Sequence, residues 1–432
     1  MRYWVETLGC PKNHVDSDKL QGLLGVQGYI PADSPDDADL VVVNTCAFIE
    51  AAREESIETV LDMSDRRRDG ARLVVTGCMA ERYGDELAAA LPEVDLVAGF
   101  GESLVAPTPV SLSRRKTSEF DLLNLPRPTT TSPWAYVKIA EGCDRRCGFC
   151  AIPTFRGDQR SRSLDSIVDE TRQLVAGGVK EVVLIAQDLA SWGNDRRRHA
   201  LGEAVEVLDE GGTQPLVDLT RALSSEVERL RLLYLYPSGL TASLIEAILE
   251  TKVPYFDLSL QHASRDHLRR MKRWGSSERF LERIAAIREM APAASFRSSF
   301  ILGYPGETED DHAELLDFLR EARLDWAGFF TYSAEEGTTA ATMANQVPSE
   351  LALERLREAS ALQDDITASR RDDMVGTIQS VLIDAPGVGR SPGEAPEIDG
   401  VIHVPDTLAV GTVVTCRITQ SHGTDLEAVP VE

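Results

Sequence analysis

Three cysteines stand within one short segment, GCDRRCGFCAIP, at residues 142–153. Cys143, Cys147 and Cys150 are four and then three positions apart. Structural zinc sites and thiolate-bound [4Fe–4S] clusters usually take four protein ligands. The nearest further candidates are distant in sequence, at Cys78 and His199. A set of only three therefore predicts an iron–sulfur cluster with one iron left open to a small molecule, and a zinc site is the alternative.

A second set of three cysteines is spread along the N-terminal part of the chain. Cys10, Cys46 and Cys78 each follow a short apolar run, and we expect each run to be a buried strand. The carboxyl ends of parallel strands lie along one edge of a sheet, where such folds bind ligands. Cysteines more than thirty positions apart can therefore converge there. Three ordinary buried cysteines are the alternative, but their shared place after a strand favours a second metal site.

The elements that must position these cysteines indicate an α/β protein. Residues 1–105 alternate apolar runs with helical stretches, which predicts a doubly wound parallel sheet. A proline-rich linker is expected at 106–133. Residues 134–370 carry six strand–helix units, fewer than the eight units of a complete barrel, so a partial (β/α)6 barrel is expected. Residues 371–432 contain short strands between Gly and Pro turns, which predicts a small all-β module.

Composition narrows the class of protein. The chain has 432 residues, a formal net charge of −25 and seven cysteines. An odd number of scattered cysteines argues against a disulfide framework. No apolar run approaches the roughly 18 residues of a membrane span, and the opening residues lack the apolar region of a signal peptide. We therefore expect a cytoplasmic protein. The charge disfavours passive binding to nucleic acid and suits a basic protein partner, although a local basic patch could override it.

The motif at Cys143, with Phe149 just before the last cysteine and a partial barrel around it, resembles the radical S-adenosylmethionine superfamily. With the upstream three-cysteine region and the downstream β module, the whole chain resembles the methylthiotransferases, whose C-terminal piece is called the TRAM domain. The resemblance implies S-adenosylmethionine and two [4Fe–4S] clusters as cofactors. The implied cluster ligands are Cys10, Cys46 and Cys78 for one cluster, and Cys143, Cys147 and Cys150 for the other.

Further positions acquire a role by the same resemblance. Ala186-Gln187 departs from the Gly-Gly-Glu type motif that many superfamily members carry after the second strand. His262 could equally be a hydrogen-bond partner behind the site, and the turn from Gly303 to Gly306 would allow close backbone approach. The side chains implied to contact S-adenosylmethionine are Phe149, Gln187, Gln261 and Arg297. No catalytic side chain is expected beyond the cluster ligands.

Two stretches, TLGCPKNHVDS and NTCAFIEAAREES, are similar to the methylthiotransferases that modify an aspartate of a small-subunit ribosomal protein. Members that modify a transfer-RNA adenosine are the alternative, and a non-catalytic scaffold braced by metals is a more distant one. From Met374 to Glu432 there are eight acidic residues and two arginines, a balance that attracts a basic ribosomal protein.

The resemblance also implies the reaction. Sulfur held on the first cluster is methylated by one S-adenosylmethionine. A second one, cleaved at the other cluster, yields a radical that removes hydrogen from the β-carbon of the aspartate. A low-potential donor of flavodoxin or ferredoxin type is the implied source of electrons.

Overall fold

The computed structural model describes residues 1–105, 120–196 and 214–431. Its contacts divide the chain into two compact units. The first comprises Met1–Thr129, Glu141–Asp144 and Ala151–Arg162, and the second comprises Thr130–Ala140, Arg145–Cys150 and Ser163–Glu432. Residues 106–119, which are half of the predicted linker, and residues 197–213, which include His199, lie outside the described residues. Within the described ranges, no helix has the length and apolar character to cross a membrane.

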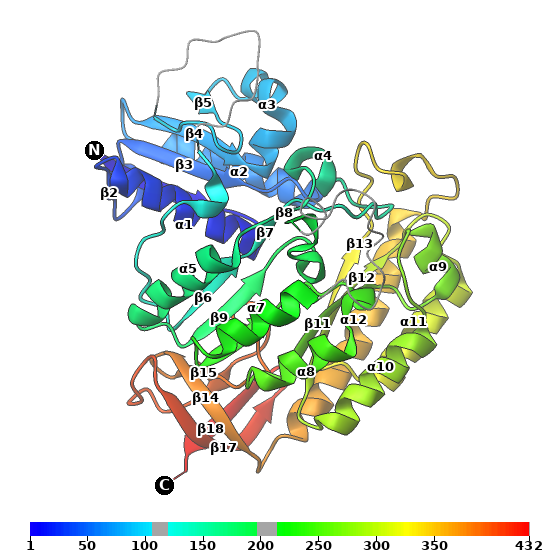
Figure 1. Ribbon diagram of the computed structural model, residues 1–432. Coiled ribbons are helices and arrows are strands. Elements are labelled where there is room, and N and C mark those ends of the chain that lie inside the picture. Colours follow the sequence, from blue (N-terminus) through cyan, green and yellow to red (C-terminus); the bar gives the residue numbers. More distant parts are fainter. Residues whose placement is uncertain (106–119, 197–213, 432) are drawn as a thin grey trace. The chain divides into compact units, whose positions relative to one another are not determined.

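The first unit is built on a five-stranded parallel sheet with the order β2-β1-β3-β4-β5 (Figure 1). Its elements in chain order are β1 (Arg2–Thr7), α1 (Pro11–Val26), β2 (Ile30–Pro31), β3 (Leu40–Thr45), α2 (Glu50–Arg66), β4 (Arg72–Gly77), α3 (Cys78–Ala90), β5 (Leu96–Val97) and α4 (Ile152–Arg156). The short strands β7 (Ala140–Glu141) and β8 (Arg160–Ser161) pair with each other.

Helices cover both faces of this sheet because its central strands are apolar on both sides. On β3, Val42 packs with Leu20 and Leu24 of α1. The next residue along the strand, Val43, packs in a separate cluster with Val60 of α2. Alternate residues of a strand point to opposite faces, so α1 and α2 lie on opposite sides. The prediction of a doubly wound parallel sheet is confirmed.

The second unit contains a row of six parallel strands with helices between them (Figure 1). Its elements are β6 (Trp134–Lys138), α5 (Leu164–Ala176), β9 (Glu181–Ile185), α7 (Gln214–Ser224), β10 (Arg229–Leu232), α8 (Ala242–Glu250), β11 (Tyr255–Gln261), α9 (Arg265–Arg270), α10 (Ser277–Met290), β12 (Ser295–Leu302), α11 (Glu309–Ala322) and β13 (Trp326–Thr331). The strands form two sheets of three, β10-β9-β6 and β11-β12-β13, and a parallel bridge from Leu235 to Leu258 joins them. Among the described residues β13 does not pair with β6, so the row stays open, as predicted.

Local sequence signals explain where several of these helices begin. A Ser or Thr side chain accepts a hydrogen bond from the backbone N–H three residues later at Ser163, Thr241, Ser276 and Thr308. Such a cap satisfies one of the N–H groups that a helix start leaves unpaired, and typically contributes about 1 kcal/mol. The helices packed against the strands are therefore fixed at their first turns.

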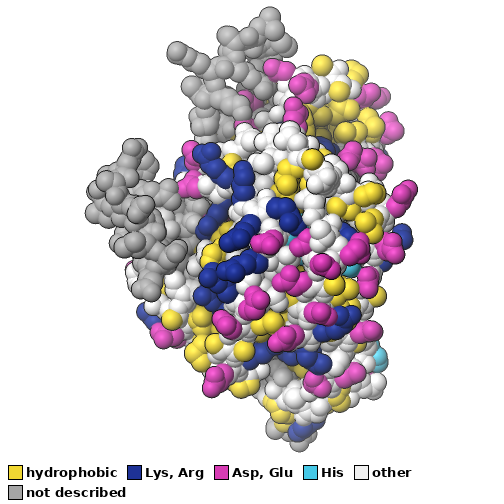
Figure 2. Space-filling model, turned by 90° about the vertical axis from the view of Figure 1, so that its right-hand side faces the viewer, with side chains coloured by type: hydrophobic (Ala, Val, Ile, Leu, Met, Phe, Trp, Pro, Cys, Tyr) yellow, Lys and Arg dark blue, Asp and Glu magenta, His cyan; other side chains and the backbone are white. Residues whose placement is uncertain are grey.

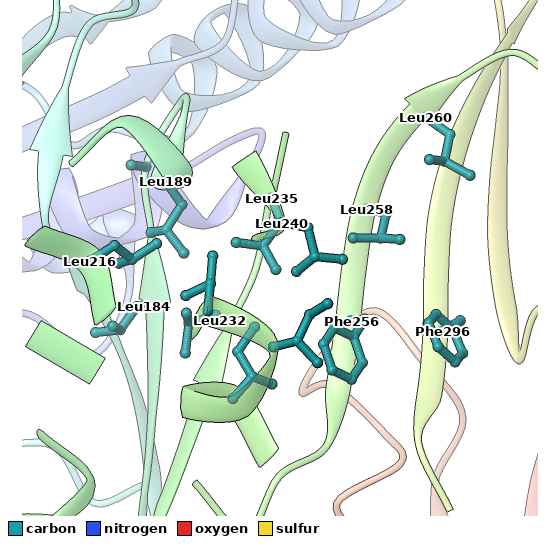
Figure 3. Close-up of a cluster of buried hydrophobic side chains, with 14 of the residues drawn as sticks. Leu184, Leu189, Leu216, Leu232, Leu235, Leu240, Phe256, Leu258, Leu260 and Phe296 are labelled. Carbon is teal, nitrogen blue, oxygen red and sulfur yellow. The ribbon is translucent and has the colours of Figure 1, made fainter. Parts of the chain in front are cut away.

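The core of the second unit lies between the strands and these helices. Leu184 and Leu232 from neighbouring strands and Leu216 from α7 belong to one buried cluster with Phe256 and Phe296 (Figure 3). Along β11, the side chains of Phe256 and of every second residue after it belong to this cluster, on the side of the strands that the helices cover. The residues between them therefore face the concave side of the strand row.

One strand is shorter than the sequence predicts. We expect the third barrel strand at 231–236, but β10 ends at Leu232. Tyr234 adopts a left-handed backbone conformation with φ of 64°, and its N–H donates to the carboxylate of Asp257 at 2.9 Å. This bend takes the chain out of the sheet pairing, although Leu235 still bridges to β11.

The chain ends in a closed five-stranded barrel that follows the long helix α12 (Ser349–Asp372). Its strands are β14 (Ile378–Ala385), β15 (Val388–Arg390), β16 (Ile402–His403), β17 (Val413–His422) and β18 (Asp425–Pro430). Cys416 is fully buried in its apolar core, as expected for a plain core thiol. The predicted small all-β module is confirmed.

A loop of this module contacts the amino-terminal ends of the barrel strands. Trp326, the first residue of β13, donates from its indole nitrogen to the carbonyl of Gly393 at 2.8 Å. Arg390 lies 3.1 Å from the carboxylate of Glu181, the first residue of β9. The module thus covers the end of the barrel opposite to the carboxyl ends of the strands, where barrel enzymes carry their chemistry.

Candidate functional site

The three N-terminal cysteines lie at the carboxyl edge of the first sheet. Cys10 precedes α1, Cys46 follows β3, and Cys78 opens α3 directly after β4. The loop before Cys10 approaches Cys46 closely, because a Cβ on Gly9 would lie 2.9 Å from the Cys46 sulfur. Gly9 also has a φ of 88°, which a residue with a side chain rarely adopts. The local backbone is therefore shaped to bring Cys46 against this loop.

Burial of Cys46 and Cys78 favours their neutral thiol form in the absence of a cation. Burial raises the pKa of Cys46 to about 12, and the neighbouring Cys78 and Cys10 thiols raise it further. Burial also raises the pKa of Cys78. Thiolates are the metal-binding form of cysteine, so a positively charged centre would have to displace the protons. Three thiols at one sheet edge have the donor chemistry of an iron–sulfur site.

The spacing of the ligands would differ between one zinc ion and a cluster. A single zinc ion with bonds of ~2.3 Å would hold its sulfurs within about 3.8 Å of one another. Among the described residues, no three His, Cys, Asp or Glu side chains are grouped to hold one metal ion.

A buried polar network surrounds Cys78, and the sequence did not reveal it. The guanidinium of Arg156 donates to the Cys78 sulfur at 2.9 Å and to the side-chain oxygen of Asn13 at 2.7 Å. The same group contacts Glu141 at 2.8 Å and Asp16 at 3.2 Å. All five residues belong to the first unit. One signal was available: Asn13 and Asp16 are polar residues three apart on the helix that starts after Cys10, and both are buried.

The second cysteine motif is divided between the two units, so its two portions are described separately. In the first unit, Cys143 is buried and its N–H donates to the carbonyl of Gly157 at 3.0 Å. In the second unit, the Cys150 N–H donates to the Cys147 carbonyl at 3.2 Å, which makes a tight turn. Phe149 is partly buried against the core of that unit.

Gly148 holds this turn close to its neighbours. Its N–H donates to the carbonyl of Met271 at 2.8 Å, and its own carbonyl accepts from Ala340 at 2.9 Å. A Cβ at this position would lie 2.4 Å from the hydroxyl oxygen of Tyr304. Only glycine fits there, so the turn that carries Cys147 and Cys150 is fixed by backbone contacts.

Two arginines stack on one tyrosine beside the turn. The guanidinium carbons of Arg145 and Arg273 lie 3.6 Å and 4.2 Å from the centroid of the Tyr236 ring. Arg145 also donates to the buried carboxylate of Asp188 at 2.7 Å, and Arg273 donates to the Cys147 sulfur at 3.4 Å. Cation–π contacts contribute about 0.5–2 kcal/mol each. The stack therefore ties the cysteine turn to the carboxyl ends of β9 and β10. The motif analysis singled out none of these three side chains.

The structure brings only some of the predicted S-adenosylmethionine contacts to this edge. Gln187 follows the carboxyl end of β9, and Gln261 is the last residue of β11, with a φ of 73°. Arg297 is the third residue of β12, so the strand continues five residues beyond it, about 16 Å. Its guanidinium lies 3.2 Å from Asp257 and 3.5 Å from Asp399. Two carboxylates near the amino-terminal ends of the strands thus hold Arg297 away from the edge.

The other two predicted features have local structural roles. His262 is fully buried, and its Nδ1 accepts a hydrogen bond from the Ser264 N–H at 3.1 Å. Gly303 and Gly306 both have positive φ, and a Cβ on Gly303 would lie 2.4 Å from the Cβ of Ala352 on α12. This turn therefore requires glycine for packing as well as for conformation.

Charge is unevenly distributed over the surface. Lys and Arg side chains gather in a band on the face shown in Figure 2, whereas acidic side chains spread over the rest of it. Residues 265–273, which include α9, carry five basic residues and one acid. The net charge of −25 is therefore a poor guide to what this face binds, because close-range fields depend on the local groups.

Family models match three stretches of the chain. Residues 2–99 match the uncharacterized protein family UPF0004, residues 137–319 match the radical SAM superfamily, and residues 366–431 match the TRAM domain. The ribosomal protein uS12 methylthiotransferase RimO of Moorella thermoacetica is 41% identical over 97% of each chain. The protein of the same name from Saccharopolyspora erythraea is 40% identical over 100% of this chain and 95% of its own. This chain belongs to the RimO family. The resemblance to radical S-adenosylmethionine methylthiotransferases is confirmed.

Membership in the RimO family and the radical SAM superfamily implies two cofactors, S-adenosylmethionine and a [4Fe–4S] cluster. Among solved structures, the radical S-adenosylmethionine methyltransferase TsrM of Kitasatospora setae is similar over 84% of this chain and 89% of its own. The TM-score is 0.49 at 15% identity. That likeness is too distant to inform the site.

Proposed function

We propose that this RimO-family protein attaches a methylthio group to the β-carbon of one aspartate in ribosomal protein uS12. The full-length similarity to uS12 methylthiotransferases carries the proposal. The arrangement of the cysteines supports it, because one set of three follows strand ends of the N-terminal sheet and the other follows the first barrel strand. A β-carbon C–H bond has no acidic proton, so a general base of ordinary strength could not open it.

Two [4Fe–4S] clusters form part of the proposal. Cys10, Cys46 and Cys78 would hold one, and Cys143, Cys147 and Cys150 would hold the other. Bound there, the clusters would supply the sulfur and the one-electron cleavage of S-adenosylmethionine that yields a 5′-deoxyadenosyl radical. The protein would leave one iron of each cluster without a side-chain ligand.

The chain's own residues would bind the cofactor and exclude water. Phe149, Gln187 and Gln261 are the candidates for contact with S-adenosylmethionine, because all three lie in or after the carboxyl ends of strands. Arg297 is not retained, since Asp257 and Asp399 already bind its guanidinium. The stack of Arg145, Tyr236 and Arg273 would fix the cysteine turn during the reaction. Because these groups are already ordered, the reaction would not have to lose entropy to position them.

Partner recognition is assigned to the C-terminal part of the chain. We keep the predicted division into 1–105, a linker at 106–133, a barrel at 134–370 and a module at 371–432. The acidic module would attract basic uS12, because opposite charges steer association. The band of Lys and Arg side chains in Figure 2 would attract the phosphates of nearby ribosomal RNA and so offset the repulsion from the acidic groups. A flavodoxin or ferredoxin would supply electrons, and the reaction would occur in the cytoplasm, where ribosomes work.

The decisive experiment is anaerobic turnover of the reconstituted protein. It would be incubated with uS12, S-adenosylmethionine, a sulfide source and a low-potential reductant, and uS12 would then be analysed by tandem mass spectrometry. The expected product carries one methylthio group in place of one hydrogen on a single aspartate. Parallel incubation with transfer RNA tests the alternative substrate. Modification of an adenosine, with uS12 unchanged, would overturn the proposal.

A further inference from the structure

Arg156 is an arginine of the first unit whose guanidinium has four polar side-chain partners. Its side chain is only 3% exposed. One terminal nitrogen donates to the Cys78 sulfur at 2.9 Å and to Asn13 at 2.7 Å, and the other contacts Glu141 at 2.8 Å. The ring of Phe100 covers the guanidinium at 4.6 Å. A cation is thus held out of water with a cysteine sulfur among its hydrogen-bond acceptors.

Two carboxylates fix the guanidinium against the sulfur. Asp16 contacts it at 3.2 Å and Glu141 at 2.8 Å, and the nitrogen that donates to Cys78 also donates to Asn13. A guanidinium presents its donors in a rigid fork. The fork is therefore held in one orientation, with one N–H directed at the Cys78 sulfur.

The proposed reaction leaves one electron at this place. Forming a carbon–sulfur bond takes two electrons, one from the carbon radical and one from the pair on the methylthiolate sulfur. The other electron of that pair would stay on the cluster, which would be reduced by one electron as its anionic sulfur ligand leaves. Groups that hold a fixed positive charge beside the ligand sulfurs favour that state, as do hydrogen bonds to those sulfurs.

We propose that Arg156 is a positioning residue of the sulfur-donor site, which holds Cys78 by a hydrogen bond and stabilises the extra electron left by carbon–sulfur bond formation. This inference rests on the proposed function, because it requires a cluster on Cys10, Cys46 and Cys78. Arg156 also lies six residues after Cys150 in the chain. The sequence segment that contains the proposed ligands of the second cluster therefore also contains the arginine that would stabilise the reduced state of the first cluster.

The test isolates the first site in the full-length chain. In a Cys147→Ala, Cys150→Ala background only the N-terminal set can bind a cluster. After anaerobic reconstitution, iron per chain is counted, and the midpoint potential is measured by redox titration followed by electron paramagnetic resonance. Arg156→Gln is expected to keep the iron but to lower the midpoint potential. Arg156→Lys, which keeps the charge but loses the forked donor, is expected to lower it less.

A matched control is available in the same unit. Arg127 has a largely buried guanidinium paired with Asp18, with no cysteine among its described contacts. Arg127→Gln is therefore expected to leave the midpoint potential unchanged. If Arg156→Gln does not fold, as judged by circular dichroism, the comparison of Arg156→Lys with the parent decides the question.

The outcomes distinguish a failure of the role proposed for Arg156 from a failure of the cluster assignment. An unchanged midpoint potential in both folded Arg156 variants would overturn the role of Arg156 and leave the proposed function standing. A background protein that binds no iron at all would instead overturn the cluster assignment on which the inference depends. A shift of similar size in Arg127→Gln would also count against Arg156, since any lost charge would then suffice.

Discussion

The guanidinium of Arg273 lies 3.4 Å from the sulfur of Cys147. Arg156 and Cys78 repeat the relationship at 2.9 Å in the other unit. In each three-cysteine set, one arginine thus donates to one sulfur. A guanidinium offers several donors in a fixed geometry, so each contact can orient the sulfur that it reaches. The two sets share this feature although Cys78 and Cys147 lie in different units.

The first prediction concerns Arg273. Arg273→Met should slow the formation of 5′-deoxyadenosine by about 10- to 100-fold, the usual cost of removing a group that orients a metal ligand. The measurement is single-turnover cleavage of S-adenosylmethionine by chromatography. Arg279→Met is the control, because Arg279 is an exposed arginine on α10 that stacks on Trp274 instead. Equal rates in the two variants would remove Arg273 from the site.

The second prediction concerns the barrel cysteines. Cys147→Ala should abolish the formation of 5′-deoxyadenosine, because a cluster with only two remaining thiolates at its motif would not persist. Iron at the N-terminal set should remain, and iron analysis of the purified protein checks this. Continued cleavage of S-adenosylmethionine by the variant would show that Cys147 is not a cluster ligand.

The third prediction separates the sulfur donor from the radical source. Cys46→Ala should still cleave S-adenosylmethionine but should transfer no methylthio group to uS12. Mass spectrometry of uS12 and chromatography of the nucleoside product measure the two activities in one reaction. Cys416→Ala serves as the control, since that cysteine is buried in the C-terminal barrel. Normal methylthiolation by Cys46→Ala would remove the sulfur-donor role from the first unit.

The fourth prediction concerns the base of the barrel. Glu181 is fully buried between Arg231 at 2.6 Å and Arg390 at 3.1 Å. Glu181→Gln would take the carboxylate partner from the buried Arg231, whereas Arg390 would keep its pair with Asp384, so the free energy of unfolding should fall by about 3–5 kcal/mol at neutral pH. Urea denaturation followed by tryptophan fluorescence measures the loss. The control is Glu250→Gln, which breaks an exposed pair with Arg221 and should leave the free energy of unfolding nearly unchanged.

The same carboxylate gives a pH dependence with a definite sign. Burial alone would raise the pKa of Glu181, but Arg231 and Arg390 lower it from 4.5 to about 2. The stabilisation that it contributes is therefore complete above pH 4.5 and is lost as the pH falls toward about 2. The difference in the free energy of unfolding between the parent and Glu181→Gln should stay constant from neutral pH down to pH 4.5 and should shrink at lower pH. A difference that grows on acidification would contradict the pairing.

Periodicity and strand-end logic predicted most of the fold, because apolar runs such as that around Val42 are buried on both faces and can only be central strands. The end of β10 escaped prediction for a physical reason. Tyr234 belongs to an apolar run, yet a tertiary hydrogen bond to Asp257 turns it into a left-handed conformation. Local sequence carries no information about such a distant partner.

The sequence predicted a site residue only where a residue type typical of metal sites stood directly after a predicted strand. Cysteines at strand ends could be found from sequence, but Arg156 and Arg273 could not, since arginine is usually a surface residue. Arg297 shows the opposite error of inference. Its residue type suits a carboxylate ligand, and two carboxylates of the protein itself, Asp257 and Asp399, bind it. Only the position of Arg297 along β12 shows that it lies near the amino-terminal ends of the barrel strands.

The central claim is that two sets of three cysteines each hold an iron–sulfur cluster, and metal analysis of oxygen-free protein tests it most directly. Iron, zinc and acid-labile sulfide would be counted per chain in the parent, in Cys46→Ala and in Cys147→Ala. The account predicts about eight irons in the parent and about half as many in each variant, since each cubane holds four irons. Zinc in place of iron, or a variant that keeps all the iron of the parent, would contradict it.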